Sequence, residues 1–194
     1  VQSALDGFNV TIFAYGQTGA GKTFTMAGVP GQLGVSPRTI TEIYHLIDLQ
    51  KARRDYVVTG SMLELYQQTP VDLLAKGEES KVKKKALNIR QEKNGTVAIE
   101  NLVEDICNTE EDLSALMARG NEQRTVAATA MNSESSRSHL VLIVKITSTN
   151  KQTKEVLKGK ILIVDLAGSE RLKKSQTTAE MQKESIEINR SPQP

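Results

Sequence analysis

Hydrophobic and polar residues follow one another along the chain in patterns that predict strands and helices in turn. An apolar face at helical spacing across residues 1–8 predicts the end of a helix, and the β-branched and aromatic run at 9–15 predicts a strand. A short helix is expected at 23–27, before a stretch at 28–34 that contains too many glycine and proline residues to be helical. These predicted elements are joined by short connections.

A second helix is predicted from residue 36 to about residue 52. Ser36 and Pro37 are expected to be its N-cap and first helical residue. Its apolar stripe has the i, i+3, i+4, i+7 spacing of core packing and consists of Ile40, Ile43, Tyr44 and Ile47. The run at 56–66 predicts a strand, and Pro70 is expected to end the regular structure before an exposed loop at 77–85. The four lysines of that loop are either solvated or face an acidic surface.

Short strands at 87–90 and 96–103 are predicted to form a hairpin, because Asn94-Gly95 between them is a strong turn signal. Thr109 is expected to cap the next helix, which has three acidic residues in its first turn and continues to about Arg124.

Two runs made almost entirely of Leu, Ile and Val, at 140–146 and 161–164, predict central strands that are covered on both faces. A polar turn is expected between them at 150–154, and a last helix at 179–190. Helices that interleave with buried strands indicate an α/β domain of three layers, with a central, mostly parallel sheet flanked by helices.

Composition then narrows the class of protein. The 194 residues suffice for a buried core, and 38% hydrophobic with 25% charged residues is typical of a soluble globular chain. A net charge of +2 is too small to attract the whole molecule to nucleic acid or a membrane. The three Phe and four Tyr residues all lie between Phe8 and Tyr66, which leaves no aromatic platform for single-stranded nucleic acid in the remainder.

Cysteine and hydropathy indicate the compartment. Cys107 is the single cysteine and so has no intramolecular disulfide partner, which is typical of a reducing environment. No apolar run approaches the roughly 20 residues of a membrane span, and the N-terminus lacks a signal pattern. We therefore expect a cytoplasmic protein without membrane insertion.

The strongest chemical signal is the run Gly16–Thr23, which fits G-x-x-x-x-G-K-[ST] directly after a predicted strand. Glycines allow backbone N–H groups to surround phosphate oxygens, Lys22 brings positive charge to the β- and γ-phosphates, and the Thr23 hydroxyl can ligate Mg²⁺. The helix that follows directs the positive end of its dipole at the same anion. A chance glycine-rich turn is a poor explanation, because the strand stands immediately before it.

Two polar segments adjoin the predicted central strands. Asp165–Gly168 follows one of them at the sheet edge where α/β proteins place ligands, so the Asp can hold Mg²⁺ through water and the Gly can bring an N–H to the γ-phosphate. Residues 132–139 precede the other strand and offer hydroxyls and an arginine for Mg²⁺ ligation and charge compensation. By itself this second run is also typical of a Ser-rich turn.

Three motifs in this order resemble the motor domain of kinesins: Phe13–Met26, Asn132–His139 and Asp165–Arg171. The resemblance extends to residue 191 and leaves 192–194 as a tail that departs from the family. It implies a P-loop NTPase fold and a microtubule-stimulated ATPase that uses ATP and Mg²⁺ on the cytoskeleton, with an oligomeric state set by stalk regions outside this sequence. The Leu-Glu-Leu-Tyr and Arg-Leu-Lys-Lys-Ser runs look most like minus-end-directed kinesins with C-terminal motors.

The resemblance also implies roles for individual residues. The nucleotide site comprises Tyr15, Gly16, Gln17, Thr18, Gly19, Ala20, Gly21, Lys22, Thr23 and Phe24. Mg²⁺ is ligated by Thr23 and Ser136 and supported through water by Asp165, while Gly168 senses the γ-phosphate. Arg137 pairs with Glu170 to close the site, and Asn132 and Ser135 position the attacking water. Six basic residues are implied in microtubule contacts, because tubulin is acidic: Lys93, Arg171, Lys173, Lys174, Lys183 and Arg190.

Two other functions remain open on the residues alone. A GTPase shares the phosphate loop and the Asp-x-x-Gly segment, but its guanine-reading Asn-Lys-x-Asp run lacks the final Asp at Asn150–Thr153. A non-catalytic microtubule-binding or scaffold protein derived from a motor is the second alternative, and the intact site residues argue against it. The N-terminal strands and Arg-x-Arg-Pro motif of kinesins are not found in this sequence. We therefore expect a domain that is incomplete at both ends, an exposed edge at 9–15, and weak ATP hydrolysis by this chain alone.

Overall fold

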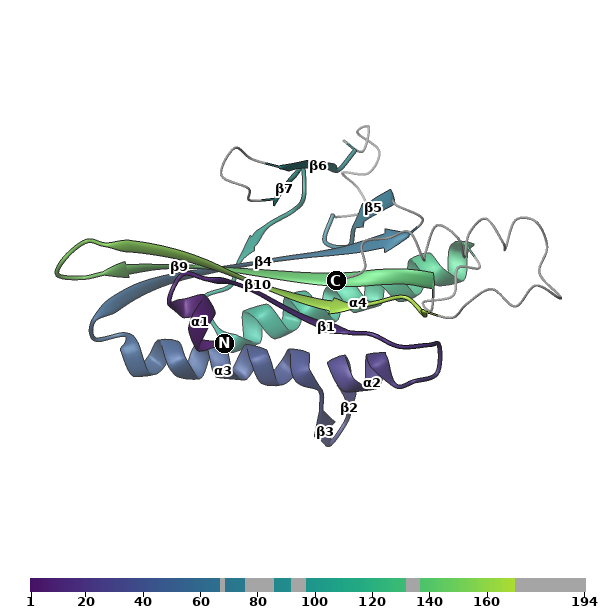
Figure 1. Ribbon diagram of the computed structural model, residues 1–194, viewed down its shortest axis with the longest axis horizontal. Helices are drawn as coiled ribbons and strands as arrows, with labels where there is room; N and C mark the ends of the chain where they lie inside the picture. The colour runs from purple at the N-terminus through teal and green to yellow at the C-terminus, as the bar shows by residue number, and fades with distance from the viewer. Residues whose placement is uncertain (67–68, 76–85, 92–96, 132–136, 170–194) are drawn as a thin grey trace.

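A central sheet organises the protein in the computed structural model, which describes residues 1–66, 69–75, 86–91, 97–131 and 137–169, with backbone only at 127–131. Within these residues the sheet has six strands, in the order β1-β10-β9-β4-β5, and β8 pairs with β4 (Figure 1). The strands are β1 (Asn9–Ala14), β4 (Arg54–Tyr66), β5 (Thr69–Asp72), β8 (Asp105–Ile106), β9 (Ser138–Asn150) and β10 (Val156–Asp165).

Helices cover one face of this sheet in the described residues, and a hairpin stands on the other face (Figure 1). The helices are α1 (Gln2–Leu5), α2 (Lys22–Ala27), α3 (Val35–Gln50) and α4 (Glu110–Met131). The projecting hairpin consists of β6 (Asn88–Gln91) and β7 (Val97–Glu100), and a smaller hairpin between α2 and α3 consists of β2 (Gly28–Val29) and β3 (Gln32–Leu33).

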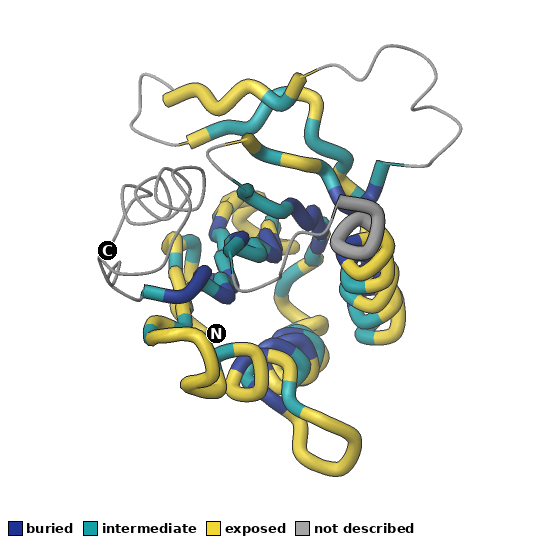
Figure 2. Tube along the Cα trace, turned by 90° about the vertical axis from the view of Figure 1, so that its right-hand side faces the viewer, coloured by how far each residue is buried: buried dark blue, intermediate teal, exposed yellow. Residues whose placement is uncertain are grey.

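The hydrophobic core lies between the sheet and these helices. Alternate residues of β9 point into it, so Leu142, Val144 and Ile146 are buried while Lys145 between them is exposed. Helices α3 and α4 contribute their apolar stripes, including Ile40, Ile43, Leu113 and Leu116 (Figure 2). The stripe predicted from helical spacing is thus confirmed as core packing at Ile40 and Ile43.

The prediction that the central sheet is mostly parallel is wrong for the described residues, where the sheet is mixed. Only β1 and β10 run parallel among the described pairs, and β10–β9, β9–β4, β4–β5 and β4–β8 are antiparallel. For the β10–β9 pair the reason is the tight turn after β9, where Asn150 Oδ1 accepts hydrogen bonds from the amides of Gln152 and Thr153 at 2.9 and 3.1 Å. A two-strand hairpin must be antiparallel, whereas continuous apolar runs report burial and not strand direction.

Two local predictions are also corrected. Helix α3 begins at Val35 with Gly34 as its N-cap, so Ser36 and Pro37 lie inside the first turn. Gly34 packs so tightly that a Cβ there would lie 2.5 Å from the carbonyl oxygen of Met26, and the helix begins two residues earlier than predicted. Pro70 does not end the regular structure but lies in β5, opposite Leu65, at an edge of the described sheet where no neighbour needs its missing N–H.

The cap predicted at Thr109 is confirmed. The amide of Asp112 donates to Thr109 Oγ1 at 3.2 Å, and the amide of Thr109 donates to Asp112 Oδ2 at 3.0 Å. The hairpin predicted around Asn94-Gly95 is confirmed in its strands, since Asn88 pairs with Glu100 and Gln91 with Val97. The predicted loop at 77–85, the turn at 93–95 and the helix at 179–190 lie outside the described residues.

Candidate nucleotide site

The phosphate-loop sequence forms the connection between β1 and α2. Gly19 and Gly21 have φ angles of 80° and 86°, a backbone region that side chains disfavour, so glycine is needed at both turns. Lys22 begins α2, and its Nζ donates hydrogen bonds to the carbonyl oxygens of Gly16 at 2.9 Å and Gln17 at 3.0 Å. The ammonium group is therefore held across the loop that precedes it.

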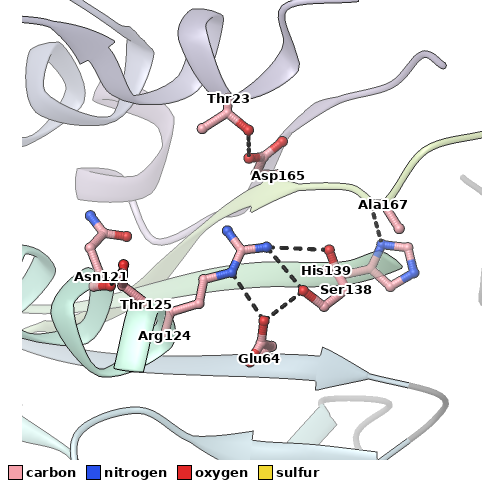
Figure 3. A network of polar contacts seen from close by, with 9 residues as sticks. All are labelled: Thr23, Glu64, Asn121, Arg124, Thr125, Ser138, His139, Asp165 and Ala167. Carbon is pink, nitrogen blue, oxygen red and sulfur yellow. Dashed lines mark hydrogen bonds and ion pairs between the residues drawn. The ribbon is translucent and has the colours of Figure 1, made fainter. Parts of the chain in front are cut away.

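Strand register brings Asp165 to this loop. The parallel pairing of β1 with β10 aligns Ala14 with Asp165, so the ends of both strands meet at one edge of the sheet. Thr23 Oγ1 donates a 2.6 Å hydrogen bond to Asp165 Oδ2 (Figure 3). The two predicted Mg²⁺-binding groups of the described residues are thus adjacent.

The environment of Asp165 fits a hydrated cation. Only 7% of this residue is exposed, and its second oxygen, Oδ1, is buried without a hydrogen-bond partner among the described residues. A cavity of about 300 Å³ adjoins it and is lined by Thr18, Gly19, Gly21, Lys22, Thr23, Asp165 and Leu166. Mg²⁺ prefers carboxylate and hydroxyl oxygens and keeps several waters, so this donor set suits it.

The segment after β10 is held on two sides by its backbone amides. Leu166 N–H donates to the carbonyl oxygen of Ala14 at 3.4 Å, and Ser169 N–H donates to that of Gly16 at 3.2 Å. Between them, Ala167 N–H donates to Nδ1 of His139 at 3.0 Å (Figure 3). These contacts place Gly168, which is buried, beside the phosphate loop.

A buried ion pair supports the start of β9. Arg124 Nε of α4 donates to Oε1 of Glu64 on β4 at 3.0 Å, and Ser138 Oγ donates to the same oxygen at 2.6 Å (Figure 3). The Arg124 guanidinium also donates to Ser138 Oγ at 3.0 Å. The sequence analysis missed this group; a single acid within the apolar strand 62–66 was a signal for Glu64, but nothing local identified its partner.

His139 follows Ser138 directly. Partial burial lowers the pKa of its imidazole, the nearby positive charge of Arg124 acts in the same direction, and the negative charge of Asp165 opposes both. The neutral imidazole is therefore favoured, and neutral imidazole is the form in which Nδ1 accepts a hydrogen bond.

The structure brings together the described part of the predicted site: the loop Gly16–Thr23, Asp165 and Gly168. Tyr15 and Phe24 flank the loop with exposed rings, at 57% and 52%. Arg137 immediately precedes β9, but its predicted partner, Glu170, is outside the described residues. The other predicted residues outside them are Asn132, Ser135, Ser136, Glu170, Lys93, Arg171, Lys173, Lys174, Lys183 and Arg190.

Comparison with known proteins gives consistent similarities. The kinesin motor domain profile matches residues 1–192. Kinesin-like protein KIN-14I of Oryza sativa is 45% identical over 191 residues, which cover 98% of this chain and 15% of that protein.

Among solved structures, a fast kinesin described for its ATPase mechanism and interactions with microtubules aligns with a TM-score of 0.86 and 38% identity, over 97% of this chain and 52% of its own. The C-terminal motor and motor homology domain of Kar3Vik1 aligns with a TM-score of 0.82 and 39% identity, over 98% of this chain and 47% of that one. The chain thus spans about half of each solved chain and less than a fifth of the plant relative. No helix in the described ranges is long and apolar enough to cross a membrane.

Proposed function

The chain belongs to the kinesin family of motor domains, and on that premise we propose that it is part of a microtubule-stimulated ATPase that couples hydrolysis of MgATP to movement along microtubules. The observation that carries the proposal is the hydrogen bond from Thr23 to Asp165, beside Lys22 and a cavity of about 300 Å³. The resemblance to C-terminal motors extends the proposal to that subgroup, and the protein is expected in the cytoplasm on the microtubule cytoskeleton.

In this proposal the phosphate loop binds the nucleotide through its backbone amides. Lys22 exchanges its bonds to the Gly16 and Gln17 carbonyls for oxygens of the β- and γ-phosphates. Tyr15 and Phe24 supply exposed aromatic surface next to the loop. Loop amides and Lys22 together position the phosphates, and positioning with charge stabilisation accounts for most of the catalysis of phosphoryl transfer.

Thr23 and Ser136 would hold the Mg²⁺, and Asp165 would support it through water at its unpartnered Oδ1. When bound, the ion supplies charge neutralisation between the β- and γ-phosphates. Gly168 is expected to offer its N–H to the γ-phosphate, for which no acceptor is found within the described residues. Arg137 and Glu170 would close the site, with Asn132 and Ser135 orienting the attacking water.

Microtubule binding is proposed for the basic residues that the family resemblance implies. Complementarity between basic residues and an acidic track speeds association and fixes orientation. The residues are Lys93, Arg171, Lys173, Lys174, Lys183 and Arg190.

The test is steady-state ATP turnover by the purified protein with and without microtubules, with Lys22→Ala as the control for contaminating ATPase. We expect weak turnover by this chain, which microtubules stimulate, which is absent from Lys22→Ala, and for which excess GTP competes poorly. Folded protein that shows no turnover above the Lys22→Ala control would overturn the proposal. Microtubule pelleting that nucleotide does not alter would then favour a non-catalytic binding protein.

A further inference from the structure

His139 lies where the two polar segments of the site meet. The antiparallel register of β9 with β10 ends at the pair Leu140–Asp165, so the residues after Asp165 leave the sheet beside His139, which remains paired with Leu65 of β4. One of these segments precedes β9 and contains the predicted Mg²⁺ and water-positioning residues. The other follows β10 and contains Gly168. A side chain at position 139 can therefore contact both segments where they join the sheet.

The contact is a hydrogen bond to the backbone and not to another side chain. Ala167 is 4% exposed, and its N–H donates to His139 Nδ1 at 3.0 Å (Figure 3). A buried N–H that loses its acceptor costs free energy, so this amide has a strong preference for the position opposite the imidazole. The bond thus fixes the backbone one residue before Gly168.

The position next to His139 in β9 is anchored by side-chain hydrogen bonds. This neighbour, Ser138, is 3% exposed and bonded to both members of the Arg124–Glu64 pair. On either side of Ala167, the amides of Leu166 and Ser169 donate hydrogen bonds to the end of β1 and to the phosphate loop. His139 therefore joins two anchored units, one based on α4 and β4 and the other on β1.

We propose that His139 is a positioning residue that couples the two segments, by holding Ala167 so that the Gly168 N–H is aligned for the γ-phosphate. This proposal rests on the proposed ATPase function. It is separate from the implied Arg137–Glu170 pair, because it acts through the backbone amide of Ala167. Its chemistry requires an acceptor atom attached to Cγ of residue 139.

Two variants of His139 distinguish the effect of the hydrogen-bond acceptor from the effect of side-chain bulk. Asn carries Oδ1 on Cγ, where the imidazole carries Nδ1, so His139→Asn retains an acceptor at the same reach. His139→Leu fills the space without one. The first readout is amide hydrogen exchange in the peptide that contains Ala167, measured by mass spectrometry without nucleotide. We expect exchange about tenfold faster in His139→Leu and close to the original rate in His139→Asn, as follows from the loss of one hydrogen bond.

The second readout is ATP turnover. His139→Leu should lower kcat about five- to tenfold with KM for ATP changed less than about twofold, because the bond aligns the transition state and does not bind the ground state. His139→Asn should recover kcat to within about twofold. If His139→Leu does not fold, His139→Ala, which also lacks an acceptor, replaces it.

The proposal is overturned if both variants exchange and turn over like the original protein, or if folded His139→Asn is as impaired as His139→Leu. Amide exchange decides the inference even if the original protein shows no ATP turnover. In that event the proposed function fails, while the structural coupling by His139 stands or falls on the exchange rates alone.

Discussion

Thr23 Oγ1 donates a 2.6 Å hydrogen bond to Asp165 Oδ2 although 142 positions separate the two residues in the chain. The contact depends on a single parallel strand pair, β1 with β10, which aligns Ala14 with Asp165. The loop that follows β1 then delivers the hydroxyl to the carboxylate. Sheet topology therefore assembles the centre of the site before any ligand is involved.

Thr23→Val should abolish most ATP turnover, since it removes the hydroxyl and keeps the shape of the side chain. We expect kcat to fall at least about 100-fold, the size of effect seen when a polar group that acts on the transition state is lost. Thr23→Ser retains the hydroxyl and should stay within about fivefold of the original. The measurement is steady-state turnover across a Mg²⁺ titration, and equal activity of the Val and Ser variants would contradict the role of the hydroxyl.

Arg124→Met should destabilise the fold by about 3–5 kcal/mol, because it leaves the Glu64 carboxylate buried without its charge partner. The Arg124 and Glu64 side chains are only 10% and 15% exposed. The matched control is Arg119→Met in the same helix, where the ion pair with Asp105 is 45% and 41% exposed and should contribute less than about 1 kcal/mol. Urea denaturation of both variants gives the comparison. Similar losses in the two would show that the Arg124 pair behaves like a surface pair.

Local chemistry was predictable from the sequence. The phosphate loop, the Thr109 cap and the Asn150 turn are each encoded within a few residues, where hydrogen bonds connect near neighbours in the chain. The loop lies where the pattern placed it, next to Asp165 and Gly168. For the site, the resemblance to the family implied the role of each residue. The structure showed which of the described site residues lie next to one another.

Strand direction and the Arg124–Glu64 pair were not predictable in this way. A buried strand is apolar on both faces whether its neighbour runs parallel or antiparallel, so the pattern carries no direction. Arg124 and Glu64 are 60 positions apart, and neither has a periodic pattern that identifies the other. The contact of His139 with Ala167 follows from the β9–β10 register, which becomes available only once the strands are paired.

Gly120→Ala should destabilise the protein, although alanine normally stabilises a helix by about 1 kcal/mol relative to glycine. Gly120 lies in α4 against Met62, and a Cβ at position 120 would lie 2.2 Å from the Met62 sulfur. Met62 is 1% exposed and has little space to move, so we expect a loss of about 1–2 kcal/mol from overpacking. In a Met62→Ala background the same substitution should be neutral or stabilising. Urea denaturation of the four proteins measures the coupling, and an equal effect in both backgrounds would exclude this contact as the cause.

Stability should fall above about pH 8.5 because of Cys107. This residue is 2% exposed between β8 and α4. Burial, reinforced by the negative charges of Asp112 and Asp105, raises the pKa of its thiol to about 11. The unfolded chain ionises the thiol near its ordinary pKa of about 8.5, whereas the folded protein keeps it neutral, so rising pH favours the unfolded state across this window. Below the lower value the thiol is neutral in both states and contributes no pH dependence.

The loss should reach at most about 1.4 kcal/mol for each pH unit between about 8.5 and 11. Tyr44, whose hydroxyl donates to the Cys107 carbonyl oxygen at 2.9 Å, extends the loss to higher pH, because burial also raises its pKa. Cys107→Ala removes the thiol and its pH dependence, so the stability that this substitution costs relative to the original protein should shrink as pH rises. Urea denaturation at pH 7.5, 9, 10 and 11 should therefore show the original protein losing about 3 kcal/mol more than the variant over this range. Parallel profiles for the two proteins would mean that the Cys107 thiol ionises equally readily in the folded and unfolded states.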